Sequence, residues 1–385
     1  MPLENLFAPV GTPGAPGPRR RRYERFGVLD NPFPAAAQTS GHPHLDTGVD
    51  AQVDEAIKAF VEGHASNALA VTATQGIGKT NLLNAYTDAL RNALGGRGYY
   101  VIRYMPDPEP SFDPLLRSIF EQLGEEHFKR VAATAAEPAR AATVRRALAD
   151  IQGRDVRSVV EALCRARQDG QPQRLDEIAK LAYEWFIGLP ARKLHREGLG
   201  VNFRLDSVES RTRALRDIAY FSAALGELQG IFLLLDELEK HGSTYSKGVV
   251  LRYLSALRAL IDALPRYLFL MVALTTDALE RYREMLPALK GRLANEVHLV
   301  PIRDEDDAVR YWRYYLDRAR EDARLQAQAH GWPSQSAPTD VVPEPEARKC
   351  FRDLRKSSTV DGVRQRDFLD HLNRVAGNEL GGSAS

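Results

Sequence analysis

Apolar residues along the chain follow two alternating spacings, which together predict an α/β fold. Short continuous apolar runs, typical of strands buried on both faces of a parallel sheet, occur at residues 68–72, 231–235 and 268–274. Residues 99–104 and 297–300 predict two further short strands. Between these runs, apolar residues recur every three or four positions, as on one face of a helix. The pattern therefore predicts a parallel sheet covered by helices.

A long stretch without any strand pattern interrupts this alternation. Residues 124–229 are rich in Ala, Arg and Leu at helical spacing, which predicts a helical insertion between two strands. Helical spacing returns at 344–354 and 362–375, which predicts a small C-terminal helical lid. The expected parts of the chain are a disordered basic arm (1–24), the first part of the α/β core (25–123), the insertion (124–229), the rest of the core (230–302), the lid (303–378) and a disordered tail (379–385).

Composition excludes several classes of protein. With 44% hydrophobic and 27% charged residues among 385, the chain is neither collagen-like nor disordered throughout. The formal charge of +1 gives no overall attraction to nucleic acid or anionic lipid, so a polyanion site must be a local patch. The two cysteines, Cys164 and Cys350, have no metal-ligand spacing, which is typical of a reducing compartment. No apolar run approaches the roughly 20 residues that span a bilayer, so we expect a cytoplasmic protein without a membrane partner.

Residues 73–80, which read ATQGIGKT, carry the first candidate chemistry. They match the phosphate-loop pattern GxxxxGK(S/T), except that Ala73 replaces the first glycine. Gly76 and Gly78 permit positive φ, so backbone N–H groups can surround phosphate oxygens where the next helix begins. Lys79 is expected to reach the β and γ phosphates, and the Thr80 hydroxyl to coordinate Mg²⁺. The expected nucleotide-binding residues of this segment are Thr74, Gln75, Gly76, Ile77, Gly78, Lys79, Thr80 and Asn81.

Two acidic residues follow the second long apolar run. Asp236 and Glu237 end the sequence GIFLLLDE at 230–237. Asp236 is a candidate Mg²⁺ ligand, and Glu237 is a candidate base that polarises water for attack on the γ phosphate. An alternative is that both acids cap the next helix, where negative charge is favourable. With a phosphate loop upstream, the pair favours ATP hydrolysis over phosphoryl transfer to a small molecule.

Polar residues at three later places complete the candidate site. Thr275 and Thr276 follow the apolar run that ends at Leu274, and either hydroxyl can orient the attacking water, although each is also a candidate helix cap. Arg292 precedes the last predicted strand and is a candidate for stabilising γ-phosphate charge across a subunit boundary. Arg364 and Arg366 lie at the start of a predicted helix, where positive charge is unfavourable unless an anion binds.

Taken together, these motifs resemble the AAA+ ATPase family, over roughly residues 50–105 and 230–376. Within that family, the NPF sequence at 31–33, the DELEK sequence and the phrase PALKGRL resemble prokaryotic ATP-binding proteins related to origin-recognition ATPases, including those of BREX-type phage-defence systems. The resemblance implies that Asn31 and Phe33 lie near the adenine of a bound ATP.

The resemblance also implies a function. It implies an oligomeric ATPase that hydrolyses ATP with Mg²⁺ to assemble or remodel a DNA-associated complex, in phage defence or in the control of mobile elements. The implied partners are further copies of the chain, an effector protein and DNA, and the helical insertion is the expected place for a partner surface. The alternative is a nucleotide-gated oligomeric switch that turns over little ATP and recruits an effector.

Overall fold

The computed structural model describes residues 23–38, 42–63, 67–106, 111–240, 245–330 and 339–381. The expected basic arm lies outside the described residues, except for Tyr23 and Glu24 at its end. Residues 382–385 of the expected tail lie outside them as well.

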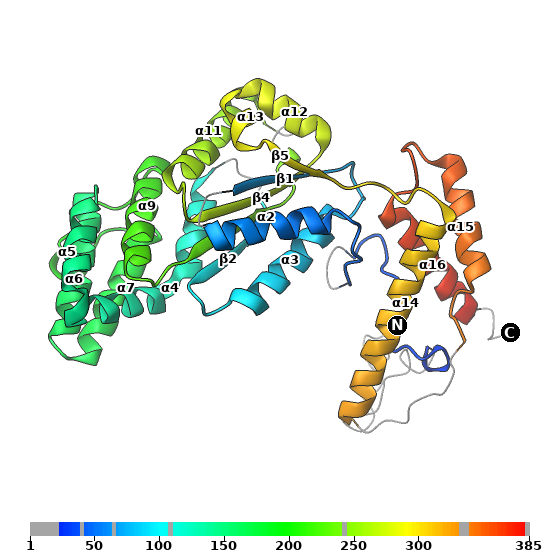
Figure 1. Cartoon of the computed structure of the whole chain (residues 1–385), viewed down its shortest axis with the longest axis horizontal. Helices are drawn as coiled ribbons and strands as arrows, with labels where there is room; N and C mark the ends of the chain where they lie inside the picture. The colour runs from blue at the N-terminus through cyan, green and yellow to red at the C-terminus, as the bar shows by residue number, and fades with distance from the viewer. Residues whose placement is uncertain are drawn as a thin grey trace, which may run out of the picture. The chain divides into compact units, whose positions relative to one another are not determined.

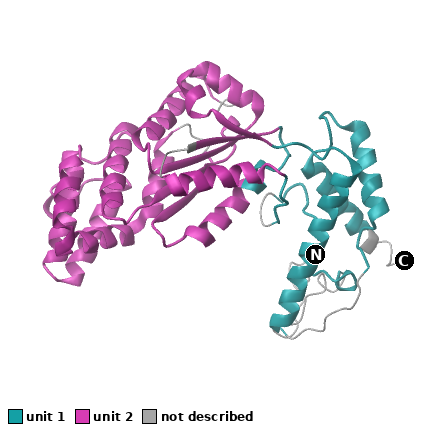
Figure 2. Cartoon of the chain, viewed as in Figure 1, with its two compact units in different colours: residues 1–47, 74–82, 299–385 teal, residues 48–73, 83–298 magenta. Residues whose placement is uncertain are grey.

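The chain divides into two compact units, which are described separately (Figure 2). The sheet unit consists of residues 48–73 and 83–298, and the helical unit of residues 1–47, 74–82 and 299–385. Residues 25–47 and the phosphate-loop segment thus group with the C-terminal helices, whereas the sequence predicts both as parts of the core. The domain boundaries expected from the sequence therefore stay predictions.

Five parallel strands form the centre of the sheet unit, in the order β2-β3-β4-β1-β5 (Figure 1). The strands are β1 (Asn67–Thr72), β2 (Tyr99–Tyr104), β3 (Gly230–Leu235), β4 (Leu268–Leu274) and β5 (Asn295–His298). Every residue of β3 and β4 is buried, which explains their continuous apolar sequences. The predicted α/β class with a parallel sheet is confirmed, although β5 begins two residues earlier than expected.

Helices flank this sheet in the sheet unit. They are α2 (Asp50–Gly63), α3 (Lys79–Leu94, with residues from Leu83 in this unit), α11 (Lys247–Ala263), α12 (Thr276–Met285) and α13 (Ala288–Arg292). Phe60 of α2 packs on one face of the sheet, with ring centroids 5.2 Å from Phe232 of β3 and 5.6 Å from Phe269 of β4. Because all five strands are parallel, their carboxyl ends lie at one edge, where ligands of open α/β sheets bind.

The predicted helical insertion lies between β2 and β3, and the described residues there form no strand. Its helices are α4 (Asp113–Ala135), η3 (Pro138–Arg140), α5 (Ala141–Asp150), α6 (Arg154–Gln168), α7 (Pro172–Phe186), α8 (Lys193–Leu199) and α9 (Val208–Ala224). Phe128 of α4 stacks on Phe186 of α7 at 5.0 Å between ring centroids. Gly124, with φ 68° and ψ 174°, breaks the helical geometry of α4 where the sequence had placed the start of the insertion.

A buried polar network joins this insertion to the sheet. The His127 ring contacts the Tyr100 hydroxyl through Nδ1 at 2.6 Å and the Ser222 hydroxyl through Nε2 at 2.9 Å. Arg130 Nη2 donates to the same Tyr100 hydroxyl at 2.7 Å. Burial, followed by the nearby Arg130 charge, lowers the pKa of His127 from 6.5 to about 3, so the ring is neutral in the folded protein at neutral pH.

We expect this histidine to make folding pH-dependent. The unfolded chain binds a proton at His127 below about pH 6.5, whereas the folded chain binds one only near pH 3. The stabilisation is therefore complete above pH 6.5 and is lost as the pH falls, by up to about 1.4 kcal/mol per pH unit. Urea unfolding at pH 7.5 and pH 5 should show a smaller loss for His127→Gln than for the unmodified chain. Equal losses in the two proteins would contradict the assignment.

The helical unit has a separate hydrophobic core. It contains α14 (Glu305–His330), α15 (Glu344–Ser357), α16 (Gln365–Gly381) and the short η2 (Glu24–Phe26). Helix α16 continues three residues beyond the lid boundary expected at 378. The large buried side chains of this core include Phe26, Phe33, Trp312, Tyr315, Phe351 and Phe368. No helix among the described residues has the length and apolar character needed to cross a membrane.

Candidate functional site

The segment after β1 has the backbone geometry that a phosphate loop requires. Gly76 and Gly78 have φ of 86° and 105°, values that L side chains rarely adopt. Ile77 between them is buried, which anchors the loop, while Thr74 and Gln75 are exposed. Helix α3 begins directly after Gly78, so the N–H groups of its first turn follow the two glycines.

Lys79, the first residue of α3, is 8% exposed, and its ammonium donates to the Thr74 carbonyl oxygen at 3.3 Å. The side chain thus lies across its own loop rather than extending into solvent. Thr80 is half-buried. Asn81 has a structural contact instead, because its Nδ2 donates to the Pro43 carbonyl at 3.1 Å. The expected roles of Lys79 at phosphate and of Thr80 at the metal stay predictions.

The start of α16 lies against the same loop, within the helical unit. The Arg366 N–H donates to the Gly76 carbonyl at 3.1 Å, and a Cβ atom added to Gly76 would lie 3.5 Å from Cδ of Arg364. The structure thus brings both predicted arginines next to the loop, and their contact with a nucleotide stays a prediction. Gln365, which was not predicted from the sequence, covers the Cα of Gly78. Its only sequence signal was its place between the two arginines.

The NPF segment is held by α16. Asn31 Nδ2 donates to the Asn373 carbonyl at 2.8 Å, and its Oδ1 accepts the Phe33 N–H at 3.1 Å. Phe33 is buried in the core of the helical unit. Both residues therefore have packing and hydrogen-bonding roles in the structure, and their expected place near an adenine stays a prediction.

Asp236 lies at the carboxyl edge of the sheet, directly after β3, and is 1% exposed. Its N–H extends the β2–β3 ladder by donating to the Tyr104 carbonyl at 3.0 Å. Oδ1 accepts the Glu237 N–H at 2.9 Å, and Oδ2 lies 2.5 Å from Nη2 of Arg103. The carboxylate is thus turned into the protein toward β2. These contacts do not support the alternative that Asp236 caps a helix.

The buried carboxylate of Asp236 is a suitable ligand for Mg²⁺. The described residues contain no group of three or more His, Cys, Asp or Glu side chains that would enclose a metal. Mg²⁺ is bound in proteins through one or two carboxylates, with water and substrate phosphates as its other ligands. A single buried carboxylate such as that of Asp236 is a ligand of this kind.

Glu237 has an unusual backbone. Its φ of 54° makes it the one non-glycine residue with positive φ in the described part of the chain. Such a conformation costs about 1–2 kcal/mol and is found preferentially at functional sites. Its carboxylate forms an ion pair with Lys240, three residues later. Glu237 therefore differs from its neighbours in its backbone conformation, and its catalytic role stays a prediction.

Thr275 and Thr276 follow β4, the strand between β1 and β3, so they lie at the same edge of the sheet as Asp236. Thr275 Oγ1 accepts the Ala278 N–H at 3.3 Å and caps α12. The helix-cap alternative is thus confirmed for Thr275, whose hydroxyl proton can still be donated to water. Thr276 is the first residue of α12 and is half-buried.

Arg292 is not brought to this edge. It comes before β5, and so it lies toward the amino edge of the sheet. Nε and Nη2 contact the two Asp262 oxygens at 2.6 and 3.0 Å, and Nη1 donates to the Ala288 carbonyl at 3.0 Å. A role in the site of its own chain is therefore ruled out by its position, and a role toward a neighbouring subunit requires release from Asp262.

Because Arg292 forms an ion pair with Asp262, two variants can test the role of Arg292 toward a neighbouring subunit. Both groups are about one-third exposed, so Arg292→Ala and Asp262→Ala should each lower the free energy of unfolding by no more than about 1 kcal/mol. If Arg292 acts toward a neighbour, only Arg292→Ala should reduce ATP hydrolysis, about tenfold or more. Asp262→Ala should keep or raise it, because it frees the guanidinium. Equal rates in the two variants would assign Arg292 a structural role alone.

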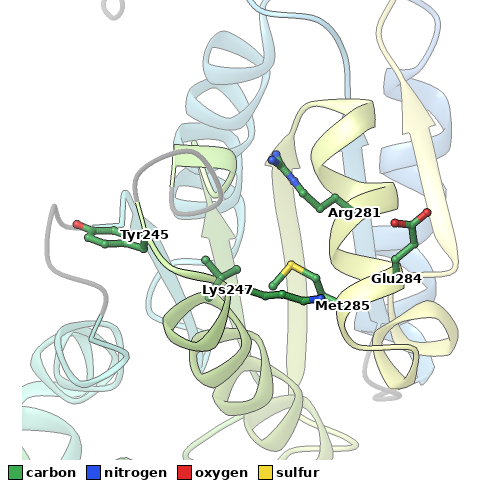
Figure 3. Close-up of a pocket in the computed structure, with 6 residues that line it drawn as sticks. Tyr245, Lys247, Arg281, Glu284 and Met285 are labelled. Atoms are coloured by element: carbon green, nitrogen blue, oxygen red, sulfur yellow. The ribbon is translucent and has the colours of Figure 1, made fainter.

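A surface cavity of about 340 Å³ opens beside α11 and α12 in the sheet unit (Figure 3). Its lining residues are Tyr245, Lys247, Val250, Arg281, Glu284 and Met285. Arg281 and Glu284 come from α12, and Lys247 comes from the start of α11 (Figure 3). None of the residues predicted from the sequence lines this cavity.

Two solved structures of one archaeal protein are similar to the chain. The Aeropyrum pernix ORC2 protein with ADPNP and ADP gives a TM-score of 0.40 at 15% identity, over 89% of this chain and 72% of that one. Its ADP form gives 0.41 at 14% identity, over 89% and 73%. No protein-family model and no curated protein matches the chain. At this similarity, an assignment of function depends on the residues of the site.

Proposed function

We propose that the chain is an AAA+ type ATPase that binds ATP with Mg²⁺ and hydrolyses it. One observation carries this proposal. The glycines of a phosphate-loop sequence have positive φ, and they lead from a buried strand into a helix whose first residue is a buried lysine. This arrangement supplies backbone N–H groups, a helix N-terminus and an ammonium to a phosphate chain.

The other residues have distinct roles in the proposed reaction. Thr80 and Asp236 would hold Mg²⁺, which would neutralise phosphate charge when bound. Glu237 polarises the attacking water by accepting its proton, and the hydroxyl of Thr275 or Thr276 orients that water. Arg364 or Arg366 contacts the nucleotide from α16, next to the loop.

The wider role follows from the sequence resemblance. We propose a cytoplasmic ATPase that assembles or remodels a DNA-associated complex, in phage defence or mobile-element control, as an oligomer with an effector protein. The proposed partner surface is the helical insertion, in which the large apolar side chains of Phe203 and Leu194 are 77% and 65% exposed.

A second candidate is a nucleotide-gated switch with little turnover. Two contacts favour it: Glu237 is paired with Lys240, and Arg292 is paired with Asp262. Both groups proposed for hydrolysis are thus engaged within their own chain. Release by a partner would then control turnover, while ATP binding alone controls assembly.

Equilibrium binding of radiolabelled ATP to the full chain tests the shared part of both candidates. We expect a dissociation constant in the micromolar range, with tighter binding in the presence of Mg²⁺ than in the presence of a chelator. Adding double-stranded or single-stranded DNA to the same binding measurement tests the proposed association of the chain with DNA. Failure to bind any nucleoside triphosphate would contradict both candidates.

A further inference from the structure

The end of β2 supplies a cation to the acidic residue proposed as a metal ligand. Arg103 and Asp236 are 133 residues apart in sequence but adjacent in the sheet, because β2 and β3 pair in parallel with Arg103 opposite Leu234. Arg103 Nη2 lies 2.5 Å from Asp236 Oδ2. The other carboxylate oxygen accepts the Glu237 N–H. Both oxygens of Asp236 are therefore already in use.

Burial makes this contact strong. Asp236 is 1% exposed and Arg103 is 13% exposed, so water screens the pair poorly. A buried carboxylate without a partner is unfavourable, and removal of one member of a buried pair leaves the other uncompensated. Among the described residues, Arg103 is the one cation that contacts Asp236 within ion-pair distance. A divalent cation at Asp236 would supply the same compensation.

Arg103 also contacts the helix that follows the phosphate loop. Its Nε donates to Asn84 Oδ1 at 3.2 Å, and its Nη1 donates to the Tyr104 carbonyl at 3.4 Å. Asn84 is four residues after Thr80 in α3, and residues at this spacing lie on the same face of a helix. One guanidinium thus connects β2, the acid after β3, and α3.

We propose that Arg103 is the counter-charge of Asp236 when no metal is bound, and that Mg²⁺ competes with it for Oδ2. Binding of the metal then displaces the guanidinium from the carboxylate, and the displacement reaches α3 through Asn84. Arg103 is in this sense a positioning residue, because Mg²⁺ binds Asp236 only when the guanidinium leaves Oδ2. The inference depends on the proposed ATP site, and it adds a control of that site by β2.

The test is the metal dependence of ATP affinity, measured as the ratio of dissociation constants with a chelator and with Mg²⁺. Arg103→Met keeps the length of the side chain and removes its charge, so the ratio should rise by about tenfold. Arg103→Lys keeps the charge and should give a smaller rise. In the double variant Arg103→Met/Asp236→Asn, the ratio should not rise, because no carboxylate remains at position 236 to bind the metal. Arg91→Met is the matched control, since Arg91 contacts the Val101 carbonyl and forms no ion pair with a described residue.

A second measurement is independent of nucleotide. The thermal midpoint of the nucleotide-free protein should rise with Mg²⁺ alone in Arg103→Met, more than in the unmodified chain or in Arg91→Met. An unchanged affinity ratio and an unchanged Mg²⁺ effect in Arg103→Met would overturn the competition, even if ATP binds as proposed. If the unmodified chain binds no ATP, the proposed function fails, and the Mg²⁺ effect on the midpoint still decides whether Arg103 and metal compete.

Discussion

Replacement of Glu237 by Gln is expected to reduce ATP hydrolysis by at least about 100-fold, while ATP affinity changes little. The amide keeps the size of the side chain but cannot take a proton from water. The positive φ of Glu237 supports a specific role, because a backbone strained by about 1–2 kcal/mol persists only where its surroundings require it. Phosphate release and ATP binding, measured on the same protein, separate the two effects.

Glu284→Gln is a suitable control for this variant, because Glu284 is an exposed acid on α12. It should leave both quantities unchanged. Hydrolysis at the unmodified rate in Glu237→Gln would remove Glu237 from the mechanism. A parallel loss of ATP binding would indicate that the side chain supports the site rather than the chemistry.

Replacement of Lys79 by Met is expected to weaken ATP binding by about 100-fold, which corresponds to about 3 kcal/mol. The change removes charged hydrogen bonds to the phosphates and keeps the apolar stem of a side chain that is almost fully buried. Unfolding by urea should therefore remain cooperative.

Lys58→Met, on the exposed face of α2, is the matched control and should bind ATP normally. Unchanged ATP affinity in Lys79→Met would contradict the assignment of residues 74–81 as the phosphate site. A loss in both lysine variants would indicate a nonspecific effect of charge.

Local sequence patterns predicted much of this structure because they act over a few residues. The apolar runs at 231–235 and 268–274 are strands since both faces of the sheet are covered, and the glycines of the loop have the positive φ that their place required. For Thr275, the sequence allowed a helix cap or a water-orienting role, and only the Ala278 N–H contact identifies the cap.

Contacts between distant residues were not predictable from spacing. The guanidinium of Arg103 was not singled out, because nothing in the sequence of β2 places it beside Asp236. The Asp262 partner of Arg292 likewise depends on how α11 and α13 pack. Arg364 and Arg366 were found from an unfavourable charge at a helix start, whereas Gln365 between them carries no such signal.

The most direct test of the central claim is phosphate release from ATP by the full chain with Mg²⁺, with and without DNA, beside Glu237→Gln and Lys79→Met. The proposed ATPase predicts release by the unmodified protein, loss of release in both variants, and loss of ATP binding only in Lys79→Met. Phosphate release that is equal in all three proteins, or an unmodified chain that neither binds nor hydrolyses ATP, would contradict it.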